Sequence, residues 1–134
     1  MNKQACIMHN VSCQTGKLSL DLTSEGHNQI EKAANEIISK ALQWGIIKIH
    51  HSPDNKSVNT ARFLKKCLDR KGFKAIRTLS TPELQTDNLD SVEEMIVVKT
   101  RKAGFHVFIS HRNCFGSRLA EGEIEFAEIS KAEV

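Results

Sequence analysis

The chain has 134 residues, of which 40% are hydrophobic and 26% are charged, with 19 basic against 16 acidic side chains. These fractions are typical of a globular domain and exclude a disordered, collagen-like or coiled-coil chain. The formal charge of +3, with one Trp and no Tyr, lacks the concentrated basic and aromatic surface of most nucleic-acid binders.

The sequence also bears on compartment and partners. No apolar run reaches the roughly 20 residues of a membrane span, and the N-terminal segment has no signal-peptide apolar region. We therefore expect one cytoplasmic domain over residues 1–134, with neither a membrane nor a nucleic acid as partner. The spacing of the cysteines contains no Cys-x-x-Cys pair and favours free thiols over a zinc site or a disulfide framework. They are Cys6, Cys13, Cys67 and Cys114.

The first half of the chain alternates strand and helix patterns. Residues 5–8 and the β-branched residues 46–50 predict buried strands. Between them, apolar residues recur at steps of three and four up to Leu42, which predicts a helix capped by Thr23 or Ser24 and ended near Gly45. A second helix is predicted from about residue 56 to residue 70, with Gly72 as its stop.

The second half continues this alternation. Residues 73–77 predict a third, more exposed strand, and residues 90–93 resemble a capping box that opens a helix closed by Gly104. Residues 105–109 predict a fourth strand. A short helix is expected over residues 115–120, and residues 123–129 alternate as a half-exposed final strand does.

This order of elements predicts an α/β fold, a three-layer α/β/α sandwich with a mostly parallel central sheet. Ligands of such sheets bind beyond the carboxyl ends of the strands. Three polar clusters are expected there, at residues 9–10, 51–56 and 110–113.

Histidine and lysine side chains at strand ends suit an anion pocket, because both donate hydrogen bonds to phosphate oxygens. A neutral histidine is also a competent nucleophile toward phosphorus. The alternative is that these histidines only satisfy backbone groups or face solvent.

Four segments in register carry a resemblance to a known family. Residues 7–10, Ile-Met-His-Asn, stand where that family has Arg-His-Gly, and residues 22–29 match its Leu-Thr-x-x-Gly-x-x-Gln helix start. Residues 52–61 match its Ser-Pro-x-x-Arg-Ala-x-x-Thr-Ala segment, and residues 107–111 end in its Ser-His pair. The chain resembles the histidine phosphatase superfamily, the phosphoglycerate-mutase-like fold, and most of all its short phosphohistidine-phosphatase branch.

The resemblance implies a role for each matched position. His9 would be the nucleophile that becomes phosphorylated, His111 would donate to the phosphoryl oxygens, and Lys56 would stand for a pocket arginine. The other phosphate-binding positions expected are Asn10, Ser52 and Arg112. The scheme requires no metal and no other cofactor, and the partner would be a phosphorylated small molecule or a phosphoprotein.

Departures from the family pattern leave the function open between two alternatives. Met8 replaces an arginine, and Lys56 keeps the charge of an arginine without its bidentate geometry. Loss of one such donor commonly costs on the order of 10²–10³ in rate. The chain is therefore either a weak phosphatase that hydrolyses phosphohistidine or another phosphomonoester or phosphoramidate through phospho-His9, or a catalytically inactive binding or regulatory domain.

Two further alternatives concern the residues near the pocket. Compensation for Met8 by His50, His51 or Arg112 is conceivable, but a strand alternates sides, so at most one of the two histidines faces the site. The other interpretation makes this pair a solvent-facing or hydrogen-bonded strand end. A flavodoxin-like or receiver-like domain would need acidic residues or a phosphate loop after the first strand, and neither is evident there.

Overall fold

The structure is a computed structural model that describes residues 5–9, 23–85, 89–110 and 126–128. The elements in chain order are β1 (Ala5–His9), α1 (Ser24–Ala41), β2 (Ile47–His51), α2 (Asn55–Arg70), β3 (Ile76–Ser80), the 3₁₀ helix η1 (Pro82–Gln85), α3 (Leu89–Lys99), β4 (Phe105–Ser110) and β5 (Phe126–Glu128).

The strands form one sheet in the order β3-β2-β4-β1-β5. Strands β1 to β4 are mutually parallel, and β5 runs antiparallel to β1. The chain moves outward from β1 to β2 and β3 and then returns to place β4 between β1 and β2. Because parallel crossovers are right-handed, this reversal puts the later helix on the opposite face of the sheet from the first two.

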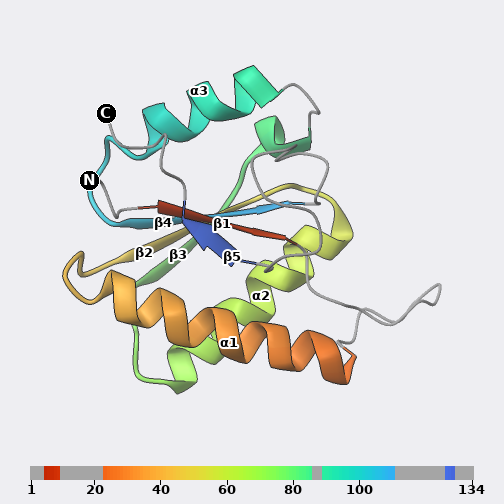
Figure 1. Ribbon diagram of the computed structural model, residues 1–134, viewed down its shortest axis with the longest axis vertical. Coiled ribbons are helices and arrows are strands. Elements are labelled where there is room, and N and C mark those ends of the chain that lie inside the picture. Colours follow the sequence, from red (N-terminus) through yellow and green to blue (C-terminus); the bar gives the residue numbers. More distant parts are fainter. Residues whose placement is uncertain (1–4, 10–22, 86–88, 111–125, 129–134) are drawn as a thin grey trace.

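Helices α1 and α2 cover one face of the sheet, and α3 covers the other (Figure 1). This confirms the α/β sandwich with a mostly parallel sheet. The core under α1 and α2 includes Met8, Ile37, Ile49, Leu64 and Val107. The core under α3 is smaller and contains Ala5, Ile7, Leu84, Val92, Met95, Ile96 and Phe108. Within the described residues, no helix is long and apolar enough to cross a bilayer.

The ends of the first two helices follow from local chemistry. The side chain of Thr23 accepts a hydrogen bond from the Gly26 N–H at 3.0 Å, which confirms one of the two predicted caps of α1. At the end of α2, Gly72 has φ +101° and its N–H donates to the Asp69 carbonyl, while the Phe73 N–H donates to the Leu68 carbonyl. This pair of bonds is a Schellman motif, so Gly72 ends α2, as predicted.

Two predicted features of α1 and β3 need correction. Helix α1 ends at Ala41 with Leu42 as its C-cap, and the Leu42 side chain, predicted to belong to the buried stripe, is 70% exposed. The third strand begins at Ile76 instead of residue 73, because the turn after α2 holds Phe73, whose ring packs against the core. The predicted exposure of this edge strand is confirmed, since none of its residues is buried.

The predicted boundaries of α3 also need correction. The helix begins at Leu89, so Asp90 lies in its first turn and is not the cap. It ends at Lys99, and Gly104 instead forms the entry to β4, with φ +114°. A Cβ at Gly104 would lie 2.9 Å from Ile46 Cγ2, so the glycine is required by close approach to the neighbouring segment.

Candidate functional site

The carboxyl ends of β1, β4 and β2 meet at one edge of the sheet. His9 pairs in register with Ser110, and His51 pairs with Ile109. Just beyond β2, the Ser52 N–H donates to the Ile109 carbonyl at 3.0 Å. These contacts bring His9, Ser52 and the residue before His111 to the same level of the sheet.

Helix α2 begins at this edge, directly after Ser52. Asp54 is its N-cap and accepts from the Ser57 N–H at 3.1 Å and from the Ser57 hydroxyl at 2.8 Å. Burial raises the pKa of Asp54, but the hydrogen bonds from the Ser57 hydroxyl and N–H act against it, and the pKa is lowered overall. The carboxylate is therefore ionised and engaged by the start of its own helix.

Lys56 lies in the first turn of α2 and is exposed. Its backbone carbonyl accepts a hydrogen bond from the Thr60 hydroxyl at 2.8 Å, the back-bond from i to i−4 that helical threonines commonly make. Positive potential at a helix N-terminus adds to the charge of this ammonium group. The start of α2 thus offers a cation and a helix dipole, opposed by the engaged carboxylate of Asp54.

A second segment closes this edge on the α3 side. The Thr81 N–H donates to the His51 carbonyl at 2.7 Å, and the Ser110 hydroxyl donates to the Leu84 carbonyl at 2.7 Å. Both bonds anchor the segment around η1 to the ends of β2 and β4. Ser110 is completely buried, so its hydroxyl holds η1 against the sheet.

The two histidines at the end of β2 point to opposite faces, as alternation requires. His50 is 3% exposed and lies beneath the α3 side, where its Nε2 is 3.0 Å from His106 Nδ1. His51 is 9% exposed, and its Nδ1 is 3.0 Å from the Ser52 carbonyl oxygen. Neither ring faces solvent, so the solvent-facing alternative for this pair is wrong. Both rings are hydrogen-bonded, which confirms the other alternative.

Met8 is completely buried in the core under α1 and α2, opposite Ile109 in register. The position where the resembled family has an arginine therefore holds an apolar side chain that packs against other apolar groups. An arginine here would have to leave this core or bury its charge, which is costly without a partner.

Of the predicted site residues, the structure places His9, Ser52 and Lys56 at the strand-end edge. Asn10, His111 and Arg112 lie outside the described residues. Asp54 belongs to the predicted cluster 51–56 but was assigned no role from the sequence, and Thr81 was not singled out. The preference of Asp for N-cap positions was a usable signal for Asp54, whereas nothing local to Thr81 indicates its contact with β2.

A cavity lies apart from this edge of the sheet. A cavity of about 380 Å³ opens between α1 and α2, and none of its lining residues comes from the strand ends. Among the described residues, no group of three His, Cys, Asp or Glu side chains is arranged to hold a metal ion. The described cysteines, Cys6 and Cys67, are buried and neither is in a disulfide.

Comparison with known proteins identifies the fold. No family model and no curated protein matches the chain. Among solved structures, the protein histidine phosphatase SixA complexed with tungstate matches with a TM-score of 0.62 and 21% identity, covering 90% of this chain and 79% of that one. A proposed phosphohistidine phosphatase SixA from Agrobacterium tumefaciens matches with a TM-score of 0.59 and 9% identity, covering 83% and 70%. The chain therefore has the phosphoglycerate-mutase-like fold of these histidine phosphatases.

Proposed function

We propose that this chain is a small phosphatase that hydrolyses phosphohistidine, or another phosphomonoester or phosphoramidate, through a phosphorylated His9. The observation that carries the proposal is the register of β1 and β4, which sets His9 beside Ser110, the residue before His111. Ser52, which precedes α2 and Lys56, is hydrogen-bonded to β4 through its N–H, so the start of α2 lies at the same edge. The proteins that share this fold are named for phosphohistidine chemistry.

The reaction would proceed in two displacements. A ring nitrogen of His9 attacks phosphorus and the bond to the leaving group breaks, with the electron pair and a proton from solvent going to that group. Water then attacks phospho-His9, which releases inorganic phosphate and restores the imidazole. Negative charge spreads over the equatorial oxygens during both steps, and preorganised donors stabilise it.

Lys56, His111 and the N-terminus of α2 would supply those donors, with Asn10, Ser52 and Arg112 as further contacts. The Ser57 N–H is taken by Asp54, so the amides that precede it in the first turn are the ones that have no partner inside the helix. A single ammonium group holds a phosphoryl group less rigidly than a bidentate guanidinium does. We therefore expect slow turnover.

The proposal is tested by phosphate release from p-nitrophenyl phosphate and from a histidine-phosphorylated carrier protein. His9→Asn should abolish release, and Lys56→Ala should slow it by about 10²-fold, because one charged donor is lost at the transition state. Lys65→Ala is the matched control, since Lys65 is an exposed lysine on the same helix. An acid-labile phosphoryl group trapped on the native chain but not on His9→Asn would identify the intermediate.

Equal rates for the native chain and His9→Asn would contradict the phosphatase. The burial of Met8 favours a second candidate for that case, a domain that binds phosphorylated groups without turnover. Calorimetric titration with tungstate decides it, because binding to the native chain and loss of binding in Lys56→Ala support an inactive anion site. Absence of tungstate binding would contradict both candidates.

A further inference from the structure

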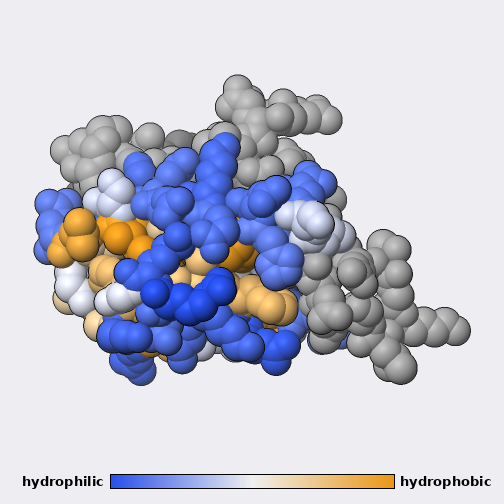
Figure 2. All heavy atoms as spheres, turned by 90° about the horizontal axis from the view of Figure 1, so that it is seen from below, coloured by the Kyte–Doolittle hydropathy of each residue, from blue (hydrophilic) through white to orange (hydrophobic). Residues whose placement is uncertain are grey.

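The groove between α1 and α2 is separate from the strand ends and has no role in the proposed phosphoryl chemistry. Ile30 and Phe63 are the apolar residues of its lining, and Ile30 is buried while Phe63 is half-buried. Figure 2 views this side of the molecule and shows apolar surface enclosed by hydrophilic side chains. An apolar floor of this kind is suited to one large apolar side chain.

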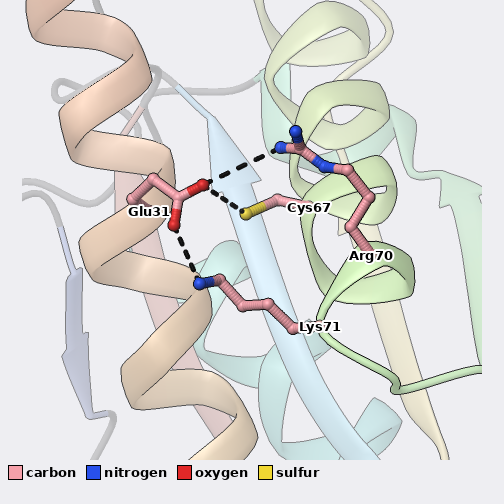
Figure 3. A network of polar contacts seen from close by, with 4 residues as sticks. All are labelled: Glu31, Cys67, Arg70 and Lys71. Carbon is pink, nitrogen blue, oxygen red and sulfur yellow. Dashed lines mark hydrogen bonds and ion pairs between the residues drawn. The ribbon is translucent and has the colours of Figure 1, made fainter.

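One acidic side chain in the groove is already neutralised by its neighbours (Figure 3). Lys71 Nζ lies 2.8 Å from Glu31 Oε2, and Arg70 lies 3.8 Å from Glu31 Oε1. The Cys67 thiol donates to the same carboxylate at 3.3 Å. The hydrogen bonds from Lys71 and Cys67 lower the pKa of Glu31, so it stays ionised and paired.

The lining itself carries two acids and two cations, and the positive excess comes from Arg62, Lys71 and Lys74 beside it. The second acid in the lining, Asp69, pairs with Lys74 at 3.0 Å. Lys66 Nζ and the Arg62 guanidinium each lie 5.8 Å from the centre of the Phe63 ring. Within the described part of the chain, no ion pair joins either cation to a carboxylate.

We propose that the groove between α1 and α2 binds a short acidic segment of a partner protein. A large apolar side chain of that segment would sit on Ile30 and Phe63, and its flanking carboxylates would pair with Lys66 and Arg62. The excess of cations around an apolar floor complements this combination of groups. A nucleic acid fits less well, because its sugar-phosphate backbone has no apolar side chain to cover Ile30 and Phe63.

The proposal is tested by selecting a displayed library of random peptides on the native protein. We expect enrichment of sequences that carry several Asp or Glu residues around one Leu, Ile, Phe or Trp. Enrichment of basic or uncharged sequences, or no enrichment at all, would overturn the proposal. A mixed single-stranded oligonucleotide that displaces the selected peptide and binds more tightly would overturn it in favour of a nucleic acid.

Charge variants then locate the binding of a selected peptide, measured by fluorescence anisotropy. Arg62→Glu with Lys66→Glu should weaken binding by about tenfold or more, because two attractions become repulsions. Lys65→Glu is the matched control, since Lys65 is exposed on the same helix but neither lines the groove nor lies over the Phe63 ring, as Lys66 and Arg62 do. Arg62→Gln with Lys66→Gln should weaken peptide binding by an intermediate amount. This neutral double variant replaces the charge-reversed one if the latter does not fold.

Amide chemical shifts give an independent readout of the same peptide. Perturbations should concentrate on α1 and α2 and should be small at the ends of β1, β2 and β4. A peptide that perturbs the strand ends instead, or that binds the Lys65→Glu and Arg62→Glu/Lys66→Glu variants equally, would contradict the groove as its site.

Discussion

The two faces of the sheet are made from the same strands but bury different chemistry. Toward α1 and α2, the strands bury a cluster of apolar side chains, among them Met8, Ile49 and Val107, and His51 lies on this side only at the end of β2. Toward α3, β2 and β4 bury two histidines, His50 and His106, beside Phe108. The rings stack, with centroids 5.2 Å apart for the histidine pair and 4.7 Å apart for His50 and Phe108.

The hydrogen bonds of the histidine pair determine where its protons lie. The Lys102 carbonyl can only accept, so His106 Nε2, 2.9 Å away, carries a hydrogen. In a neutral His106, Nδ1 is then an acceptor, and His50 Nε2 must donate to it. His50 Nδ1 is left as a buried acceptor with no partner among the described residues.

This arrangement makes the core under α3 sensitive to acid. Burial, together with the nearby His106, lowers the pKa of His50 to about 3, and burial lowers the pKa of His106 as well. Lys99 from α3 and Lys48 from β2 add repulsion to a charged His50. A proton on either ring would therefore be carried more easily in the unfolded chain than in the folded one.

The largest effect is expected from damage to the apolar face. Leu64 is completely buried in the core under α1 and α2. Leu64→Ala should lower the free energy of unfolding by about 2–5 kcal/mol, because it removes buried methyl groups and leaves a cavity. Urea unfolding should give the same loss at neutral and at mildly acidic pH. A loss confined to acidic pH would break the contrast between the faces.

An acid titration of stability is the second test. Because the folded pKa of His50 is lowered from 6.5 to about 3, its contribution is complete above pH 6.5 and is lost as the pH falls toward 3. Each such group costs up to about 1.4 kcal/mol per pH unit in this window. Urea unfolding between about pH 6.5 and pH 5, where carboxylates remain ionised, should show a decrease of about 1–2 kcal/mol.

Replacement of both histidines should have the smallest effect at neutral pH. His50→Phe with His106→Phe keeps flat rings beside Phe108 and removes both partners of the buried hydrogen bond. Such paired replacements are close to neutral, so the free energy of unfolding should change by less than about 1 kcal/mol near pH 7.5. Below pH 6.5 the double variant should lose less stability than the native chain. An unchanged acid slope would assign the pH dependence to other groups.

Local patterns predicted much of this fold correctly. The Thr23 cap and the Gly72 stop depend on residues within a few positions of each other, so their chemistry is visible in the sequence. The apolar stripe of α1 predicted its buried face but failed at Leu42. Leu42 keeps helical φ and ψ as the C-cap, but its side chain is 70% exposed, because the helix period does not show where the sheet beneath the helix ends.

The candidate site was predictable only in part. The motifs around His9, Ser52 and Lys56 placed these residues near one another, because the carboxyl ends of parallel strands share an edge. The sequence did not indicate that Thr81 and Leu84 close this edge, since those contacts depend on how β3 leads into η1. The alternation of β2 separated His50 from His51 but did not identify the partner of either ring.

Periodicity, caps and strand-end motifs were enough to give the α/β class, the helix faces and the edge at which the proposed chemistry is located. Each of these depends on interactions between near neighbours along the chain. The partnership of His50 with His106, 56 residues apart, required the alignment of β2 with β4. The groove beside Phe63 required the packing of α1 against α2. Both arise from distant segments brought together by burial of the core, which local patterns do not encode.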